Sequence, residues 1–536
     1  MKLNLSGLKE KAAWSAAGVV LPRFDIDKMV QETRRAPVWV HFGAGNIFRG
    51  FIARLQQQLL NQGLSQYGVI AAETYDYEIL DRIYAPHDNL SLLVSLKPDG
   101  TTDREIVASV ADRVKADSTN PQEIAKLKSI FENPALQMVS FTITEKGYAL
   151  ANLRGEYYPV VESDLKNGPV GARHAMSVVT ALMLDRYHAG AAPLALVSMD
   201  NCSRNGEKLR NSVLAIANAW HKNGFVDDGF VSYLSDGKKV TFPWSMIDKI
   251  TPRPSASVEK SLTDDGIEGM KPIVTGKNTF IAPFVNAEVP QYLVVEDAFP
   301  NGRPPLEKAG VYFTDRETVN NTERMKVTTC LNPLHTALAV YGCLLGYTSI
   351  AAEMKDDDLK KLVSHIGYDE GMPVVVDPKI LSPKDFLREV VEQRLPNSFL
   401  PDTPQRIVTD TSQKMPIRFG ETIKSYLKRD DLDVKNLTYI PLAIAGWLRY
   451  LLAVDDRNQP MEVSSDPMLG ELQSQLAGIT VGKPETCRGQ LKPILSNPVL
   501  FATDLCAAGL DGKIETMFKK MLKGPGAVRA TLKEYL

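Results

Sequence analysis

A glycine-rich turn between a buried strand and a helix constrains the fold of this 536-residue chain more than any other feature. Residues 38–42 (VWVHF) are a short apolar run, which predicts a strand buried on both faces. The segment GAGNIFRG follows at residues 43–50 and leads into the amphipathic stretch 47–60. A glycine turn that follows a strand and opens a helix presents backbone N–H groups to a phosphate.

The spacing of the glycines alone leaves two interpretations open. The pattern GxGxxG needs its third glycine at position 48, where the chain has Phe48, and Gly50 comes two residues late. An ordinary strand–helix turn is the alternative. In a dinucleotide site an acidic residue should follow the second strand, and Glu73 and Asp76 follow the predicted strand 67–72. Carboxylates there repel a 2′-phosphate, so they favour NAD over NADP.

Strands and helices alternate in the first half of the chain, whereas the second half is mainly helical. The alternation predicts a mostly parallel sheet, hence an α/β domain at residues 1–298 followed by a helical domain at 299–536. The proline-rich segment 299–305 marks the boundary. Further strands are predicted at 90–96, 138–144 and 194–199, and early helices at 121–131, 170–187 and 206–221. The later helices are predicted at 334–345, 356–365, 382–393, 437–452 and 468–475.

Composition excludes several classes of function. The 62 Lys and Arg residues against 64 Asp and Glu give a net charge of −2, which does not favour a nucleic-acid partner. The start of the chain lacks the apolar core of a signal peptide, and no apolar run is long enough to span a membrane. Five scattered cysteines without a CxxC pair argue against disulfides and a cysteine zinc site. These features predict a cytoplasmic protein with no membrane partner.

Seven segments in order carry a resemblance to one family. They are HFGAGN (41–46), TITEKGY (142–148), SMDN (198–201), FPWSMIDKITP (242–252), VED with GRP (295–297 and 302–304), MK with LNPLH (325–326 and 331–335), and RIVTDTSQK (406–414). With these segments the chain resembles the long-chain polyol-specific dehydrogenases, which include mannitol 2-dehydrogenase, fructuronate reductase and tagaturonate reductase. The resemblance implies a Rossmann-type NAD-binding domain, a mainly α-helical C-terminal domain, and interconversion of a secondary alcohol and a ketone without a metal.

The resemblance also implies roles for particular residues. Lys326 is the expected base that accepts the hydroxyl proton, for which burial and neighbouring positive charge must lower its pKa from about 10.4. Asn201 and Asn332 are expected to stabilise the developing alkoxide, and His335, three residues after Asn332, to bind a substrate hydroxyl. The expected substrate-binding residues are Asp248, Arg406 and Lys414. The expected cofactor-binding residues are Gly43, Ala44, Gly45, Asn46, Ile47, Glu73, Asp76, Thr144, Glu145 and Lys146.

The chain departs from the family in one spacing. The usual distance from the catalytic lysine to the asparagine is five residues, whereas Lys326 and Asn332 are six apart. An extra residue rotates a helix by about 100°, so a bulge or a non-helical start has to absorb it.

The substrate is expected to be a small sugar acid or polyol. A basic cluster of Arg394, Arg406, Lys414 and Arg418 suits a carboxylate, which favours D-mannonate and D-fructuronate over mannitol and fructose. Mannitol 2-dehydrogenase and tagaturonate reductase are the alternatives within the family. A zinc-dependent alcohol dehydrogenase is disfavoured because the seven histidines lack metal-ligand spacing. A non-catalytic dinucleotide sensor is disfavoured because Lys326, Asn332 and His335 are all present. The expected assembly is a monomer or a weak homo-oligomer.

Overall fold

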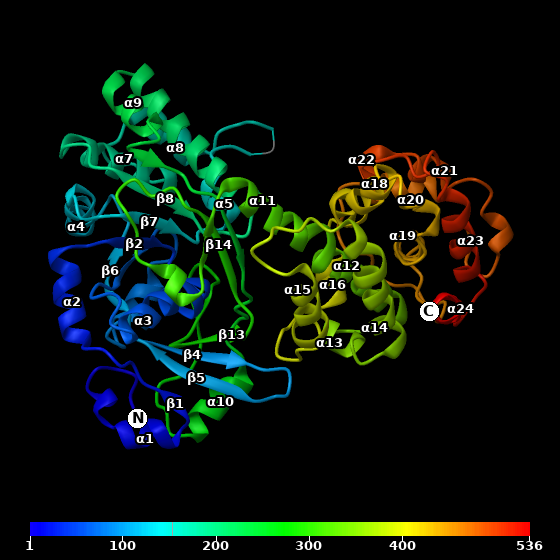
Figure 1. Cartoon of the computed structure of the whole chain (residues 1–536), viewed down its shortest axis with the longest axis horizontal. Helices are drawn as coiled ribbons and strands as arrows, with labels where there is room; N and C mark the ends of the chain where they lie inside the picture. The colour runs from blue at the N-terminus through cyan, green and yellow to red at the C-terminus, as the bar shows by residue number, and fades with distance from the viewer. Residues whose placement is uncertain (153) are drawn as a thin grey trace. The chain divides into compact units, whose positions relative to one another are not determined.

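The computed structural model describes residues 1–152 and 154–536. The chain forms two compact units, drawn from blue to green and from green to red in Figure 1. The first unit comprises Met1–Leu96 and Thr101–Asn320, and the second comprises Lys97–Gly100 and Asn321–Leu536. The domain boundary expected between residues 298 and 299 remains a prediction.

A six-stranded sheet in which every neighbouring pair is parallel forms the centre of the first unit. Its spatial order is β6 (Val110–Lys115), β3 (Val69–Glu73), β2 (Trp39–Phe42), β7 (Met138–Phe141), β8 (Leu194–Ser198) and β9 (Val240–Thr241). Numbered along the chain within this sheet, the order is 3-2-1-4-5-6, which is that of dinucleotide-binding doubly wound sheets. The direction of the winding reverses between β2 and β7, and a ligand site is expected at the carboxyl ends of these strands.

Strand β2 is buried on both faces because helices cover both sides of the sheet. Val40 and Phe42 pack with Leu127 and Phe131 in one core cluster, whereas Trp39 packs in the other. The covering helices include α3 (Ala53–Asn61), α4 (Pro121–Glu132), α7 (Ala175–His188) and α8 (Asn205–Lys222). The alternation of side chains between two cores explains why the predicted strand reads as an unbroken apolar run.

Three smaller sheets complete the first unit. The predicted strand at 90–96 forms as β4, but it lies outside the parallel sheet and pairs antiparallel with β5. The four-stranded sheet contains β1 (Val19–Val20), β5 (Thr102–Val107), β4 (Ser91–Leu96) and β13 (Phe284–Glu288). The others contain β10 (Ser245–Asp248), β14 (Tyr292–Glu296) and β15 (Tyr312–Thr314), and β11 (Ile273–Val274) with β12 (Phe280–Ile281). The remaining helices of this unit are α1 (Lys11–Ala16), α2 (Ile26–Arg35), α5 (Thr144–Tyr148), α6 (Pro159–Asn167), α9 (Asp228–Ser235) and α10 (Ala256–Asp264).

The second unit is helical: residues 321–536, all of which are described, form no strand. The buried helices α12 (Asn332–Leu345) and α19 (Tyr439–Tyr450) pack at its centre. Gly446 allows their close approach, because a Cβ there would lie 2.6 Å from Cζ of Tyr341. Helix α11 (Arg316–Met325) leads into this unit. The other helices are α13 (Ile350–Glu353), α14 (Asp357–Ser364), α15 (Pro383–Glu389), α16 (Pro404–Ile407), α17 (Thr411–Met415), α18 (Glu421–Leu427), α20 (Leu469–Gln475), α21 (Lys492–Leu495), α22 (Pro498–Phe501), α23 (Asp511–Met521) and α24 (Ala527–Tyr535).

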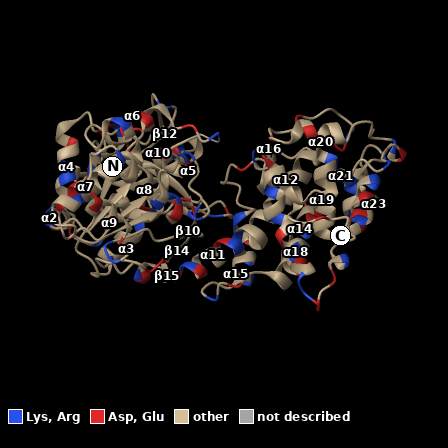
Figure 2. Ribbon diagram, turned by 90° about the horizontal axis from the view of Figure 1, so that it is seen from above, with Lys and Arg blue, Asp and Glu red and all other residues tan. Residues whose placement is uncertain are grey.

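Short π-helical segments occur in both units, and two of them, η2 and η8, fall within predicted helical stretches. Each contains i→i+5 hydrogen bonds, which shift the helix phase after it. They are η2 (Phe48–Ile52), η3 (Leu80–Tyr84), η5 (Lys326–Cys330), η6 (His365–Gly371), η8 (Val390–Arg394) and η9 (Pro416–Gly420). Charged residues of both signs are interspersed over both units (Figure 2).

Within the described residues, no helix is long and apolar enough to cross a membrane.

Candidate functional site

The glycine turn follows β2 and is shaped by residues from the two neighbouring strands. Gly43 adopts a φ of 106°, and a Cβ at this position would lie 2.2 Å from the carbonyl oxygen of Thr142. Its amide donates to the carbonyl oxygen of Ala72 at 2.8 Å. Only glycine fits here, because the backbone conformation and the close approach both exclude a side chain.

The side chain of Arg49 fixes the second half of the glycine turn. This guanidinium is buried and donates to the carbonyl oxygen of Ala282 at 2.7 Å and to Oδ1 of Asn46 at 2.9 Å. Asn46 is thereby held in the turn, and Arg49 itself faces no ligand. Arg49 is therefore a positioning residue, because its hydrogen bonds hold the loop in one conformation.

A cavity of about 670 Å³ opens at the turn, at the carboxyl ends of the parallel strands. Seven of the ten residues predicted to bind the cofactor line this cavity: Gly43, Gly45, Asn46, Glu73, Asp76, Thr144 and Lys146. Ala44 lies behind the turn, where its carbonyl oxygen accepts from the hydroxyl of Tyr84 at 2.9 Å. Ile47 precedes η2, and the exposed Glu145 forms an ion pair with Lys208.

Glu73 ties the glycine turn to the end of β3. Its carboxylate accepts from the amides of Ala44 at 2.8 Å, Thr74 at 2.9 Å and Tyr75 at 2.8 Å. Burial raises the pKa of this carboxyl, and the backbone N–H donors act in the opposite direction. The residue therefore organises the loop as well as facing the cavity.

Asp76, the second acidic residue at this end, is held by hydroxyl groups from another part of the chain. Thr275 donates to its Oδ2 at 2.5 Å, and Thr279 donates to the same oxygen. Both acidic side chains therefore line one wall of the cavity, where the second strand ends.

The segment after β7 forms the opposite wall and is pinned by Asp200. The Asp200 carboxylate accepts from the amides of Ile143 at 3.0 Å and Thr144 at 2.9 Å, and from the hydroxyl of Tyr148 at 2.6 Å. Thr144 has a φ of 63°, a left-handed conformation that these bonds stabilise. The TITEKGY motif is thus a fixed turn that ends in the short helix α5.

Asn201 and Asp248 also belong to the first unit. Asn201 is exposed in the turn after β8, and Asp248 is buried at the end of β10. Asn205 connects the two segments: its Nδ2 donates to the carbonyl oxygens of Asp200 and Ser245, each at 3.0 Å. This buried amide explains why the SMDN and FPWSMIDKITP motifs lie together.

In the second unit, Lys326 begins the π-helical segment η5. The lysine is 3% exposed, and the amide of Leu331 donates to its carbonyl oxygen at 3.1 Å. Leu331 then leaves the helical conformation with φ −130° and ψ −61°, and α12 starts at Asn332. The extra residue between Lys326 and Asn332 is accommodated by both devices, a π bulge and a non-helical break.

His335 lies on the first turn of α12; its side chain is half-buried, and its Nε2 is fully buried without a hydrogen-bond partner among the described residues. That nitrogen is 3.6 Å from Oδ2 of Asp402. Burial lowers the pKa of His335 to about 4; Asp402 opposes this change, whereas guanidinium groups nearby add to it. The imidazole is therefore neutral at neutral pH and has a nitrogen available for a hydroxyl group.

Arg394, Arg406, Lys414 and Arg418, here termed the basic group, surround this histidine. Three of them, Arg418, Arg406 and Arg394, lower the pKa of His335 by their charge. Arg406 pairs with Asp402, and Arg418 donates to Oγ1 of Thr336, one residue after the histidine. Burial and the charges of Arg418 and Arg406 lower the pKa of Lys414, while Asp410 and Asp466 act to raise it. The cluster predicted from the sequence is therefore brought together in space.

Several residues of these sites escaped the sequence analysis. Arg173, Tyr75 and Phe280 line the cavity at the glycine turn. Asp402 was missed in the second unit, although its position four residues before Arg406 is the spacing of a helical ion pair. Nothing local marks Arg173, which comes just before α7 and reaches the cavity through the fold.

Within the described part of the chain, no group of three or more His, Cys, Asp or Glu side chains is arranged to hold a metal ion.

Comparison with known proteins gives two family matches. Residues 37–308 match the mannitol dehydrogenase Rossmann domain, and residues 318–521 match the mannitol dehydrogenase C-terminal domain. D-mannonate oxidoreductase from Thermotoga maritima is 55% identical over 536 residues, which cover 100% of this chain and 99% of the relative.

Two solved structures have the same fold. The structure titled D-sorbitol dehydrogenase in substrate-free form has a TM-score of 0.80 at 25% identity and covers 96% of this chain and 98% of its own. The Pseudomonas fluorescens mannitol 2-dehydrogenase ternary complex with NAD and D-mannitol has a TM-score of 0.69 at 24% identity, with coverage of 100% and 99%. These matches confirm the predicted combination of a Rossmann-type domain and a helical domain.

Proposed function

Because the chain belongs to the mannitol dehydrogenase family, we propose that it is an NAD-dependent oxidoreductase that interconverts D-mannonate and D-fructuronate. The relative named D-mannonate oxidoreductase supports the substrate, since it matches from end to end at 55% identity. The mannitol 2-dehydrogenase of known structure is more distant, at 24% identity. The family membership confirms the resemblance seen in the sequence.

The basic group around His335 is the observation that carries the choice of a sugar acid. A neutral sugar alcohol needs hydroxyl partners only, whereas a hexonate also brings a carboxylate. Guanidinium groups bind carboxylates through paired, charge-assisted hydrogen bonds. Arg406 and Lys414 are proposed to bind the carboxylate, with Arg418 beside them.

The cavity at the glycine turn fits a dinucleotide. Its cradle at Gly43 excludes a side chain, and its volume of about 670 Å³ lies in the range of small-molecule sites. The amides of Gly45, Asn46 and Ile47 are proposed to face the pyrophosphate, since those of Gly43 and Ala44 are bonded within the protein, and Thr144 to Lys146 the nicotinamide end. The acidic wall formed by Glu73 and Asp76 supports NAD over NADP. When bound, NAD⁺ accepts a hydride from the carbon that bears the reacting hydroxyl.

Side chains of the protein are proposed to transfer the hydroxyl proton and to stabilise the charge on the reacting oxygen. Lys326 accepts the hydroxyl proton at Nζ during oxidation and returns it to the ketone oxygen during reduction. Its side chain is only 3% exposed, so the group is held away from bulk water. Asn201 and Asn332 donate amide N–H groups to the oxygen as negative charge develops there.

The remaining polar groups are proposed to orient the substrate. The free nitrogen of neutral His335 binds a substrate hydroxyl, and Asp248 accepts from another. Each such bond fixes the carbon chain so that the carbinol carbon is presented for hydride transfer.

We further propose a cytoplasmic location and a monomeric or weakly oligomeric state. All five cysteines are free in the structure, which suits a reducing compartment. Analytical ultracentrifugation over a range of concentrations tests the assembly.

The reaction is tested with D-mannonate and NAD⁺ by following NADH absorbance and identifying the product by NMR. We expect one D-fructuronate per NADH formed, with no effect of a metal chelator. Absence of NADH formation from D-mannonate, together with absence of NADH consumption by D-fructuronate, would contradict the proposal.

A further inference from the structure

We propose that a second cavity in the first unit binds a small phosphorylated sugar. This cavity has a volume of about 620 Å³ and shares no lining residue with the cavity at the glycine turn. Its walls come from α3, from the ends of β4 and β5, from the residue after β10, and from the short helix η4 (Leu306–Ala309). It is therefore a separate site on the same α/β unit.

The lining is strongly cationic. Five basic and two acidic side chains line the cavity; the acidic ones are Asp103 and Glu105, and Arg104 forms an ion pair at 2.6 Å with Asp265, which lies outside the lining. The basic residues are Arg23, Arg54, Arg104, Lys249 and Lys308. A surplus of positive charge inside a concave surface attracts a small anion and favours a phosphate dianion over a single carboxylate.

Arg54 is oriented for binding an anion. Its Nε donates to Oε2 of Glu105 at 2.7 Å, and the other oxygen of Glu105 accepts from Nε2 of Gln57 at 2.9 Å. The two terminal nitrogens of Arg54 have no hydrogen-bond partner within residues 1–152 and 154–536. Glu105 thus fixes the guanidinium through one nitrogen and leaves its paired donors for an oxyanion.

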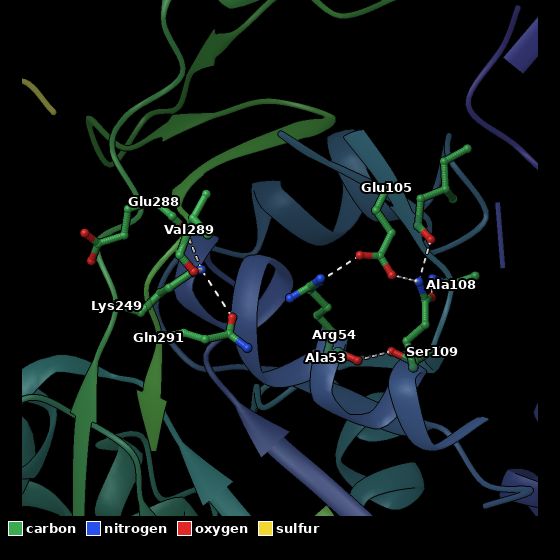
Figure 3. A network of polar contacts seen from close by, with 11 residues as sticks. Ala53, Arg54, Glu105, Ala108, Ser109, Lys249, Glu288, Val289 and Gln291 are labelled. Carbon is green, nitrogen blue, oxygen red and sulfur yellow. Dashed lines mark hydrogen bonds and ion pairs between the residues drawn. The ribbon is translucent and has the colours of Figure 1, made fainter. Parts of the chain in front are cut away.

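Lys249 is held on the other side of Arg54 from Glu105, as Figure 3 shows. Its ammonium lies 2.5 Å from the carbonyl oxygen of Glu288 and 3.2 Å from Oε1 of Gln291. These two oxygens fix the position of the ammonium. Arg54 and Lys249 together form the fixed floor of the site.

Two exposed cations supply mobile contacts. The side chains of Arg23 and Lys308 have no hydrogen-bond or ion-pair partner within the described chain, and both line the cavity. Long basic side chains without partners can close on a ligand without first breaking an ion pair. They are therefore the residues whose removal weakens binding with least effect on the fold.

Amide groups beside the cations point to a ligand with hydroxyl groups. Gln58, Asn61 and Gln62 line the cavity along α3, and Asn61 uses only Oδ1, which accepts from the amide of Arg23 at 2.8 Å. The lining contains no aromatic side chain and few apolar ones, so it offers nothing for a nucleotide base or a lipid chain. A polyhydroxylated phosphate ester matches both the charge and the amides.

The proposal is tested by titrating the full chain with glucose 6-phosphate at constant ionic strength, using isothermal calorimetry. We expect saturable binding with a Kd of about 1 mM or tighter. The double variant Arg23→Gln/Lys308→Gln should bind at least about tenfold more weakly, since each lost charge-assisted bond is worth about that factor. The control variant Arg210→Gln/Lys238→Gln removes the same charge at exposed positions outside the cavity and should bind as the unmodified chain does.

Three further titrations distinguish a sugar phosphate site from a nonspecific anion site and from the cavity at the glycine turn. Inorganic phosphate and glucose should each bind more weakly than glucose 6-phosphate, and saturating NADH should leave the binding unchanged. Absence of saturable binding, equal weakening by the control variant, or displacement by NADH would overturn the proposed site. Equal affinity for inorganic phosphate would overturn the assignment of a sugar ester.

Discussion

The amide of Leu331 donates to the carbonyl oxygen of Lys326 at 3.1 Å, five residues back along the chain. This i→i+5 bond closes a π turn and takes up one residue more than an α-helical turn. The π turn and the non-helical Leu331 together span the six-residue spacing from Lys326 to Asn332. The bond explains how Lys326 and Asn332 keep their proposed roles at a spacing of six.

Replacement of the buried lysine should abolish turnover while preserving the structure. We expect Lys326→Met to lower kcat by about 10²–10⁴-fold, the usual contribution of general acid–base catalysis. Stopped-flow measurement of NADH oxidation with D-fructuronate gives the rate. The control Lys355→Met, at an exposed lysine of the same unit, should keep full activity. A kcat within a factor of ten of the unmodified enzyme would exclude Lys326 as the base.

Loss of one member of the basic group should affect acidic substrates selectively. We expect Arg406→Gln to raise the KM for D-fructuronate by about 10–100-fold, because a charge-assisted bond to the carboxylate is lost. Weak turnover of D-fructose, which has no carboxylate, should change much less. The exposed Arg457 allows the matched control Arg457→Gln. An equal loss with both sugars would show that Arg406 does not bind the carboxylate.

A methyl group at the glycine turn should damage cofactor binding. Gly43→Ala places a Cβ 2.2 Å from the carbonyl oxygen of Thr142 and strains a φ of 106°. Backbone strain of this kind costs about 1–3 kcal/mol, so the Kd for NADH should rise by about 5- to 150-fold if the turn must regain this conformation to bind it. Fluorescence titration with NADH measures the change. Gly237→Ala is the control, since nothing lies within 4 Å of a Cβ there; similar affinities in the two variants would contradict this account.

A buried carboxyl outside the site should make stability depend on pH. Both oxygens of Glu353 lack hydrogen-bond partners among the described residues, and burial raises its pKa to about 9 from 4.5. Between these values the folded chain holds a proton that the unfolded chain has released, so the free energy of unfolding falls as pH rises, by about 1.4 kcal/mol per pH unit. We expect Glu353→Gln to remove this fall.

The test compares urea unfolding of Glu353→Gln and the unmodified chain from pH 5 to pH 8. The difference in unfolding free energy, variant minus unmodified chain, should increase steadily with pH. The exposed Glu462 provides the control Glu462→Gln, which should show a difference that is constant with pH. A constant difference for Glu353→Gln as well would mean that the buried carboxyl stays ionised.

Much of the fold was predictable because its signals are local. The apolar run at 38–42, the glycine turn and the alternation of strands with helices led to the parallel sheet that forms. The strand at 90–96 shows what local signals cannot predict. Its sequence predicts a strand, but the long-range pairing with β5 and β13 decides which sheet it joins. A bulge was among the two expectations between Lys326 and Asn332, but the other π turns were not predicted, since apolar residues do not mark the position of a π turn along a helix.

The candidate site was predictable wherever its residues lie in motifs. The basic group could be predicted because its residues lie close together in the sequence, at 394–418. Asp402 lies in the same segment and could have been predicted by the same argument. Arg173 and the hydroxyl groups of Thr275 and Thr279 approach the glycine turn only through the tertiary fold. The neutral state of His335 follows from its burial in the fold, which no local sequence pattern predicts.

The central claim is that this enzyme reduces a hexuronate with NADH. The most direct measurement is kcat/KM with D-fructuronate, compared with D-tagaturonate and D-fructose under the same conditions. The account predicts a preference for D-fructuronate over D-fructose of at least about 100-fold, from two charge-assisted contacts to the carboxylate. A value for D-fructose equal to or above that for D-fructuronate would contradict it and assign the enzyme to the polyol branch, and a preference for D-tagaturonate would assign it to the other uronate.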